Sequence, residues 1–302
     1  MRSNQQGSDM NAILVSVNYS DILCLTLNYN RHHFNSVMVV TDDADNADAC
    51  VAREHKAEVF ATRAFYDGGA SFAKWKALEQ GLDAFGRDGW LCIMDGDVLW
   101  PKKIDWNPDG NYQYGCVDES TEAIIDCDDM SWERYSVLKF GNLYSPFRRM
   151  WENWPSVPAG TLIEQRVYED YSSVLPVESE WKKFPLHRQQ HEHAGFTQIF
   201  NASDPVLGPP PWHDTSYSHC GAADSWFQQK WSADKKIRPT WEVLHLGPAG
   251  TNWYGRATMR ADGSVPEGAN EKAKMTADMW RLRSERRKQG LDPFELEKIK
   301  EN

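Results

Sequence analysis

The hydrophobic pattern of the first hundred residues alternates between short apolar runs and amphipathic stretches. Apolar runs of strand length occur at Ala12–Val17, Val37–Val40, Glu58–Ala61 and Leu91–Met94. Residues at helical spacing separate them, at Ile22–Asn30, Asp45–His55 and Ser71–Phe85. This alternation predicts right-handed crossovers and a parallel sheet that is flanked by helices.

Local signals refine some of these elements and leave others open. Ser20 or Asp21 is a suitable N-cap for the first helix, because both side chains accept hydrogen bonds from backbone amides. Further strands are expected at Tyr114–Val117 and Ala194–Phe200. No elements are assigned over residues 131–194, where the pattern is irregular.

The strand at Leu91–Met94 ends in Asp95-Gly96-Asp97, and an apolar run follows it. In open α/β sheets, ligands bind outside the carboxyl ends of the strands. Carboxylates are preferred ligands of hard divalent cations, and Gly96 allows a backbone bend that turns both acids to one ion. The alternative is an acidic turn that faces solvent.

Ile93-Met94-Asp95-Gly96-Asp97-Val98 resembles the Asp-x-Asp motif of nucleotide-sugar-dependent glycosyltransferases with the GT-A fold. The resemblance implies Mn²⁺ or Mg²⁺ bound by Asp95 and Asp97. It also implies a mixed, mostly parallel sheet flanked by helices, with a helical C-terminal extension. The domains then expected are a catalytic domain at 11–255, divided into a nucleotide-sugar-binding half at 11–105 and an acceptor half at 106–255, and a basic extension at 256–302.

The same resemblance implies contacts to a UDP-sugar donor such as UDP-glucose. By their place in the topology, Asn18 and Tyr19 would meet the uridine or ribose, and Asp42 the base or ribose. Lys74 would contact the phosphates or the sugar, and Asp95 the donor as well as the ion. The alternatives are a capped, solvated turn at Asp42 and a solvated lysine at Lys74.

Asp224 is the candidate catalytic base. The segment from Asp224 through Phe227 to Trp231 resembles the family pattern acid-x-x-Phe-x-x-x-Trp, in which the acid begins a helix at the cleft. A carboxylate within reach of the acceptor hydroxyl can remove its proton. A base at this position would suit inversion of the anomeric centre. The alternative is a simple N-cap.

His245 closes a later apolar run and is followed by Gly247. His245-Leu246-Gly247 resembles the His-x-Gly element that supplies a third metal ligand in several GT-A families, both retaining and inverting. The resemblance therefore implies one ion shared by Asp95, Asp97 and His245. The alternative is a buried histidine of the core.

Charge and composition limit the remaining possibilities. The net charge of −11 argues against a protein that coats nucleic acid by charge alone. No run of apolar residues approaches membrane-spanning length, and Met1–Met10 lacks a signal-peptide core, so we expect a cytoplasmic protein with no membrane partner. The six cysteines form no paired motif and predict no disulfide framework.

Glu271–Gly290 holds seven Lys/Arg against three Asp/Glu. A solvated helix face explains this, and so does a surface for an anionic acceptor. A cytosolic chain with a basic tail is similar, in these respects, to viral glycosyltransferases that act on hydroxymethylated DNA bases. In that case the chain would work in the host cytoplasm. A glycan or protein acceptor fits equally.

Two other functions remain open. A nucleotidyltransferase also places acids at strand ends, although Asn18–Asp21 does not resemble its Gly-rich phosphate loop. A non-catalytic sugar-binding module would account for the 14 tryptophans. A zinc site among the histidines of residues 187–220 is a further alternative to a polar loop, since no paired-ligand spacing occurs there.

Overall fold

The computed structural model describes the N-terminal half of the sheet continuously and later parts of the chain in pieces. The described residues are 10–70, 72–104, 115–117, 124–126, 142–144, 147–149, 178–183, 197–220, 223–232, 235–237, 241–246, 282, 285–286 and 288–291.

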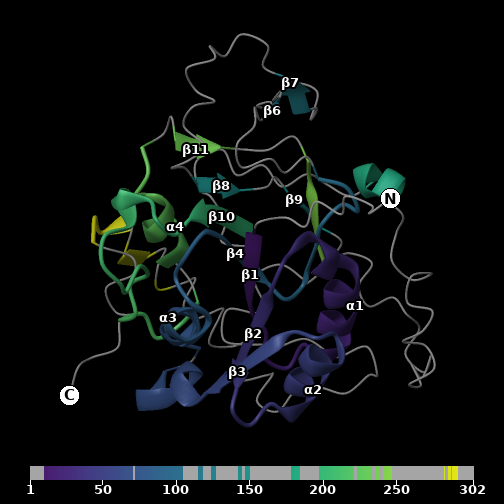
Figure 1. The fold of residues 1–302 in the computed structure, drawn as a ribbon. Helices are drawn as coiled ribbons and strands as arrows, with labels where there is room; N and C mark the ends of the chain where they lie inside the picture. The colour runs from purple at the N-terminus through teal and green to yellow at the C-terminus, as the bar shows by residue number, and fades with distance from the viewer. Residues whose placement is uncertain are drawn as a thin grey trace.

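A seven-stranded mixed sheet organises the fold, in the order β11-β8-β10-β4-β1-β2-β3 (Figure 1). Its strands are β1 (Met10–Val15), β2 (Val37–Asp42), β3 (Glu58–Thr62), β4 (Trp90–Asp95), β8 (Asn142–Tyr144), β10 (Thr197–Asn201) and β11 (Lys236–Ile237). Strands β4, β1, β2 and β3 are parallel, whereas β10 runs antiparallel to β4 and β8. The predicted mixed, mostly parallel sheet is therefore confirmed.

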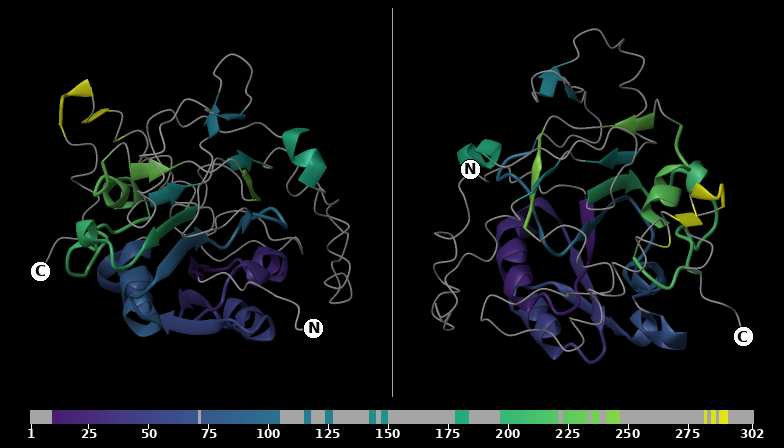
Figure 2. Two further views of the ribbon diagram at one scale, coloured as in Figure 1. Left: turned by 45° about the horizontal axis from the view of Figure 1, so that its top comes forward. Right: turned by 180° about the vertical axis from the view of Figure 1, so that it is seen from behind.

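Helices cover both faces of this sheet. They are α1 (Ser20–Asn30), α2 (Asn46–Glu54), α3 (Lys74–Phe85) and α4 (Ala223–Gln228), and the 3₁₀ helices are η1 (Arg31–His33), η2 (Arg63–Phe65), η3 (Asp67–Gly69), η8 (Glu178–Lys183) and η9 (Pro205–Leu207). Figure 2 shows α1 and α2 on one side of the sheet and α3 and α4 on the other.

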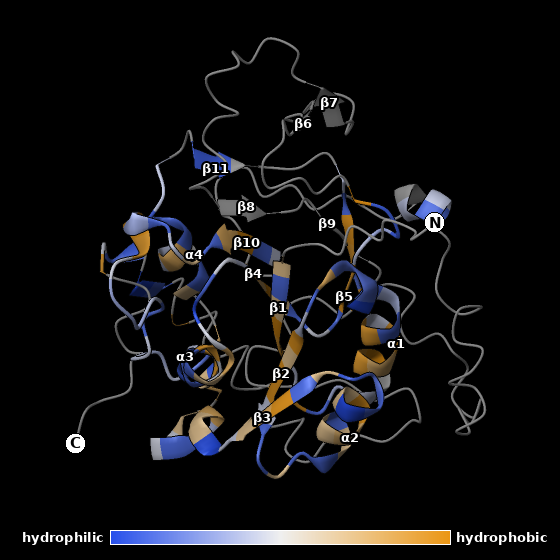
Figure 3. Ribbon diagram, in the orientation of Figure 1, coloured by the Kyte–Doolittle hydropathy of each residue, from blue (hydrophilic) through white to orange (hydrophobic). Residues whose placement is uncertain are grey.

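Alternation along the central strands explains the two layers, because neighbouring side chains of a strand point to opposite faces. On β1, Ala12 and Leu14 pack with Leu23 and Leu27 of α1, whereas Ile13 packs with residues of α3. The central strands are accordingly mostly apolar, with polar residues near their ends (Figure 3). This pattern is expected of parallel strands that are buried on both faces.

Two smaller sheets complete the described part. Strand β12 (Val243–His245) lies between β5 (Val98–Leu99) and β9 (Phe147–Arg149), antiparallel to the first and parallel to the second. Strands β6 (Gly115–Val117) and β7 (Ile124–Asp126) form an antiparallel pair. The chain thus leaves the main sheet after β4, and β5 joins a second sheet with β12 and β9, which come from later parts of the sequence.

Several boundaries differ from the sequence expectation. Helix α1 begins at Ser20, with Tyr19 as N-cap and no capping hydrogen bond from a side chain, so the predicted cap at Ser20 or Asp21 is wrong. Strands β8 and β9 lie where the sequence pattern assigns nothing, because their partners come from distant segments.

Within the described residues, no helix has the length and apolar character needed to cross a membrane. The expected helical extension at 256–302 and its basic run fall almost entirely outside the described residues.

Helix α3 approaches the sheet closely at Gly81. A Cβ atom there would lie 2.5 Å from Cγ2 of Val40 and 3.2 Å from Cδ1 of Ile13. We therefore expect Gly81→Ala to destabilise the protein by about 1–2 kcal/mol, because the overlap outweighs the gain of about 1 kcal/mol in helix propensity. Urea unfolding measures the change.

A double-mutant cycle provides the control for this prediction. Val40→Ala removes the Cγ2 atom, so Gly81→Ala should be neutral or stabilising in that background. An equal cost in both backgrounds would show that the close approach is not the cause.

Candidate functional site

The end of β4 brings the predicted acids to the edge of the main sheet. Asp95 is the last residue of β4, and Asp97 directly precedes β5. His245 is the last residue of β12 and pairs with Val98 of β5. Its Nε2 lies 3.5 Å from Oδ1 of Asp97, and both residues are 5% exposed. The structure thus joins Asp97 to His245, although almost 150 residues separate them in the chain.

The backbone holds this pair in place. The amide of Leu246 donates a hydrogen bond of 2.8 Å to the carbonyl of Asp97. Gly96 lies against the end of β1, and a Cβ atom on it would be 3.1 Å from Oγ and 3.2 Å from Cβ of Ser16. Gly96 does not adopt a positive φ. A side chain at Gly96 would therefore crowd Ser16, and the glycine does not supply a left-handed bend of the backbone.

Asp95 has a different partner from Asp97. Its carboxylate accepts a hydrogen bond from Nζ of Lys74, the first residue of α3, and the two form an ion pair. The ammonium of Lys74 is buried, whereas the Asp95 side chain is 24% exposed. Burial alone would lower the pKa of Lys74, but the charge and hydrogen bond of Asp95, together with the charges of Cys220 and Asp224, outweigh it and raise that pKa. Lys74 is therefore not a solvated lysine.

The acids outnumber the cations at this edge. Burial raises the pKa of Asp95, the charge of Asp97 raises it further, and Lys74 opposes both. His245 lies close enough to act on the same pKa. One lysine therefore compensates two neighbouring carboxylates incompletely, and a further positive charge would be stabilised here.

Asp224 lies on the Lys74 side of this group. It occupies the first turn of α4 and is half-buried. Its charge raises the pKa of Lys74 and also that of His213. Phe227 and Trp231, the two aromatic residues of this pattern, are 1% and 2% exposed and so form its buried side. Trp231 itself lies beyond the end of α4.

The candidate nucleotide-contacting residues lie at the ends of β1 and β2. Asn18 has a left-handed backbone with φ of 62°, and its amide donates a hydrogen bond of 2.5 Å to Asp45. Tyr19 is 8% exposed and belongs to an apolar cluster with Leu99 and Leu244. Its ring therefore packs inside the protein. Asp42 ends β2, is half-buried and accepts a hydrogen bond of 3.1 Å from the amide of Ala44.

Two carboxylates of α2, which the sequence analysis did not single out, support this loop. Asp45 is the N-cap of α2 and accepts from the amide of Asp48. Asp48 is fully buried and accepts a hydrogen bond of 2.6 Å from Oγ of Ser16 and one of 3.0 Å from the amide of Tyr19. The order Asp45-Asn46-Ala47-Asp48 indicates a helix start, but it does not reveal that Asp48 points inward to β1.

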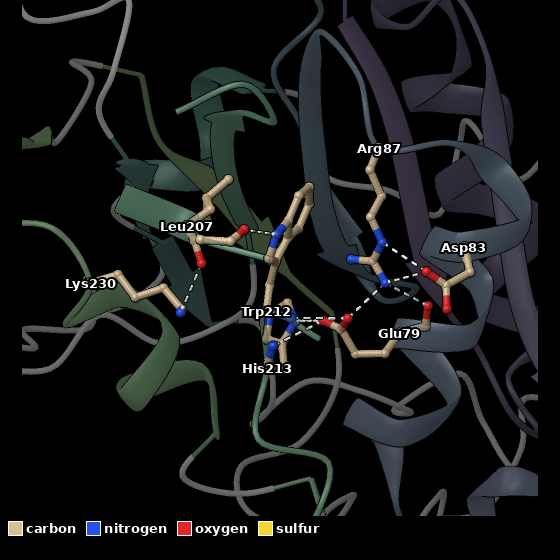
Figure 4. A network of polar contacts seen from close by, with 8 residues as sticks. Glu79, Asp83, Arg87, Leu207, Trp212, His213 and Lys230 are labelled. Carbon is tan, nitrogen blue, oxygen red and sulfur yellow. Dashed lines mark hydrogen bonds and ion pairs between the residues drawn. The ribbon is translucent and has the colours of Figure 1, made fainter. Parts of the chain in front are cut away.

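A second polar network lies behind the site, between α3 and the segment before α4 (Figure 4). Glu79 of α3 accepts from the amides of Trp212 and His213, from Nδ1 of His213 at 2.6 Å, and from Nη2 of Arg87 at 2.7 Å. The ring of His213 stacks between Trp75 and Phe227, at centroid distances of 4.8 and 4.2 Å. Burial lowers the pKa of His213, so the neutral ring donates to Glu79.

The structure therefore separates the sequence candidates into two places. Asp95, Asp97, His245, Lys74 and Asp224 lie around the ends of β4 and β12, whereas Asn18, Tyr19 and Asp42 lie around the ends of β1 and β2. Among the described residues, no three or more His, Cys, Asp or Glu side chains gather closely enough to hold a metal ion by themselves. His187, His191 and His193 of the alternative zinc site lie outside the described residues.

No protein-family model and no curated protein matches this chain. Among solved structures, the chain is similar to mannosyl-3-phosphoglycerate synthase from Rubrobacter xylanophilus, with 16% identity, a TM-score of 0.39, and coverage of 93% of this chain and 75% of that one. It is also similar to glucosyl-3-phosphoglycerate synthase from Mycobacterium tuberculosis in complex with Mn²⁺, UDP-glucose and phosphoglyceric acid, with 11% identity, a TM-score of 0.40, and coverage of 94% and 81%. Identities and TM-scores as low as these do not establish a shared activity.

The Glu79 network makes the protein sensitive to acid. Burial alone would raise the pKa of Glu79, but His213 and Arg87 outweigh it and lower this pKa from 4.5 to about 2. The carboxylate of Glu79 therefore binds a proton at a lower pH in the folded state than in the unfolded state. The stability that this difference contributes is fully present above pH 4.5 and is lost as the pH falls toward 2. The loss is on the order of 3 kcal/mol, measured by urea unfolding across this pH range.

Glu79→Gln should remove most of this pH dependence, at the cost of lower stability at neutral pH. Asp83→Asn is the matched control, because Asp83 also pairs with Arg87 but its side chain is 67% exposed. A steep acid transition that survives in Glu79→Gln would assign the effect to other carboxyl groups.

Proposed function

We propose that this protein is a metal-dependent glycosyltransferase, which moves a sugar from a nucleotide-diphosphate sugar such as UDP-glucose to an acceptor hydroxyl. The observation that carries the proposal is the contact between Asp97 and His245 at the edge of a buried sheet. A carboxylate and an imidazole that meet at 3.5 Å, both nearly buried, need a reason beyond packing. A shared cation is such a reason.

The chemistry of the residues present fits Mn²⁺ or Mg²⁺ in part. Asp97 and His245 supply one oxygen and one nitrogen, and both atom types bind Mn²⁺. Ions of this class keep several positions for substrate phosphates, so two protein ligands and a diphosphate are a suitable set. Oδ1 of Asp95 is bound to Lys74, so Asp95 would join them through its other carboxylate oxygen or after releasing Lys74. When bound, the ion would neutralise the departing diphosphate.

The other residues then have separate roles. Lys74 lies beside Asp95 and would pair with the diphosphate of the donor. Asn18 and Asp42, at the ends of β1 and β2, would meet the nucleoside, and Tyr19 would support that loop through its buried ring. Asp224 acts on Lys74 through its charge. It would accept the proton of the acceptor hydroxyl, which corresponds to inversion at the anomeric carbon.

The acceptor must present a hydroxyl group to the donor. A glycan and a hydroxymethylated DNA base both present a hydroxyl group. The basic segment at 271–290 that would bind an anionic acceptor falls largely outside the described residues. The tests below therefore measure the binding of the donor and of the metal ion.

The first test concerns metal-dependent donor binding. In a panel of nucleotide sugars, the true donor should raise the melting temperature only in the presence of Mn²⁺. At a hundredfold excess over Kd, the rise should correspond to about 2.7 kcal/mol of added free energy of unfolding. Asp97→Asn should abolish this shift relative to its own ligand-free melting temperature. Asp83→Asn is the control, since Asp83 lies near the end of α3 remote from Lys74 and its side chain is 67% exposed.

A donor-induced shift that needs no metal and persists in Asp97→Asn would overturn the metal assignment. Release of pyrophosphate from a nucleoside triphosphate, without sugar transfer, would identify a nucleotidyltransferase instead. Sugar binding with no turnover would identify a binding module.

The second test concerns the ion pair between Lys74 and Asp95. In Lys74→Met, Asp95 loses its counter-ion and becomes available to a cation. We expect Mn²⁺ to bind about tenfold or more tightly in the absence of nucleotide, because one opposing charge at contact distance is removed. UDP should bind more weakly, because the ammonium group no longer pairs with its phosphates. Isothermal titration calorimetry measures both constants.

Lys76→Met is the matched control, because Lys76 lies two residues further along α3 and is half-buried. It should change neither constant. If Lys74→Met weakens the binding of Mn²⁺ and of UDP equally, Lys74 maintains the fold of the site and does not act by pairing with the charge of the ligand.

A further inference from the structure

Two buried polar side chains of α1 face the segment that carries Asp97. Thr26 and Asn30 are 0% and 1% exposed, on a helix that otherwise buries leucines. Strand β5 follows Asp97 and lies beside α1 in Figure 3. Neither Thr26 nor Asn30 belongs to the proposed catalytic group, so their polar character requires a separate explanation.

Both side chains bind the backbone of the segment from Gly96 to Trp100. Oγ1 of Thr26 donates to the carbonyl of Gly96 at 2.6 Å. Nδ2 of Asn30 donates to the carbonyl of Val98 at 2.7 Å, and its Oδ1 accepts from the amide of Trp100 at 2.9 Å. Three backbone groups of the segment are therefore satisfied by one turn of α1.

The contacts lie in the same order along both segments. Thr26 and Asn30 are one turn apart on α1, about 6 Å along the helix axis, and they bond in that order to Gly96, in the turn after β4, and to Val98, the first residue of β5. Thr26 and Asn30 therefore meet Gly96 and Val98 in register, and a shift along the helix axis would break the bonds. Apolar side chains would pack the helix equally well but would not define this register.

The same helix is held at its other end by the carboxylates of α2. The loop before α1 contains Asn18 and Tyr19, whose amides are bound by Asp45 and Asp48. Helix α1 thus connects the loop at the end of β1 to the segment at the end of β4. Its polar contacts set the distance between the two halves of the site.

We propose that Thr26 and Asn30 are positioning residues, which hold Gly96 and Val98 so that the carboxylate of Asp97 remains opposite His245. Thr26 is the more direct of the two, because its acceptor, Gly96, is the residue between the two acids. The proposed function enters only through the identity of the ligand, a divalent cation. The positional role of Thr26 can be measured without it.

The experiment compares Thr26→Val with Thr26→Ser in the full chain. Valine keeps the shape of threonine and removes the hydroxyl, whereas serine keeps the hydroxyl. Two quantities are measured for each variant: hydrogen exchange of the peptides that cover residues 96–100, and the Kd of Mn²⁺ alone by electron paramagnetic resonance. Thr62→Val is the matched control, since the hydroxyl of Thr62 bonds to Gln80 at the surface.

We expect faster exchange over residues 96–100 in Thr26→Val, with unchanged exchange over β2 and β3. We expect the Kd of Mn²⁺ to rise about tenfold to a hundredfold, as is typical when a residue that orients a metal ligand is lost. Thr26→Ser and Thr62→Val should remain close to the wild type. If Thr26→Val does not fold, Thr26→Ala replaces it in the same comparison.

A lower melting temperature with unchanged exchange over 96–100, or with an unchanged Kd, would overturn the proposal, because Thr26 would then be only structural. If the wild type binds no Mn²⁺, the proposed function fails, and hydrogen exchange alone decides on Thr26. Faster local exchange would then support its positional role, and unchanged exchange would overturn it.

Discussion

The contact between Asp97 and His245 depends on the departure of the chain from the main sheet after β4. Strand β5 pairs with β12, and this pairing brings the imidazole of His245 to the carboxylate of Asp97. Burial makes the arrangement demanding, because a carboxylate removed from water needs compensating partners. The neighbouring carboxylate, Asp95, is compensated instead by its ion pair with Lys74.

Buried hydrogen bonds, in addition to apolar packing, hold this edge of the sheet. Ser16, Thr26, Asn30 and Asp48 are all buried, and each binds a group near the ends of β1 or β4. Apolar contacts give a layer its stability but leave it able to slide, whereas directional bonds set register. A site that requires a defined distance between nucleoside and diphosphate would benefit from such an arrangement.

The network around Glu79 provides a second rigid element behind the site. It joins α3, whose first residue is Lys74, to the segment that leads to Asp224. His213 also stacks on Phe227 of α4, so the network contacts both the helix that begins with Lys74 and the helix that carries Asp224. Stability and the geometry of the candidate site are therefore linked through the same helix.

Periodicity along the chain determined the parallel half of the sheet, its helices and the place of Asp95 and Asp97 at a strand end, because these features follow from local burial patterns. The helix start at Asp45 was also readable, since capping is a local property. Only the tertiary structure decided that Asp95 binds Lys74, that Asp97 faces His245, and that Gly96 packs closely against Ser16. Each of these involves residues that are distant in sequence, and which of several polar partners meet depends on strand pairing and helix register, which a local pattern does not encode.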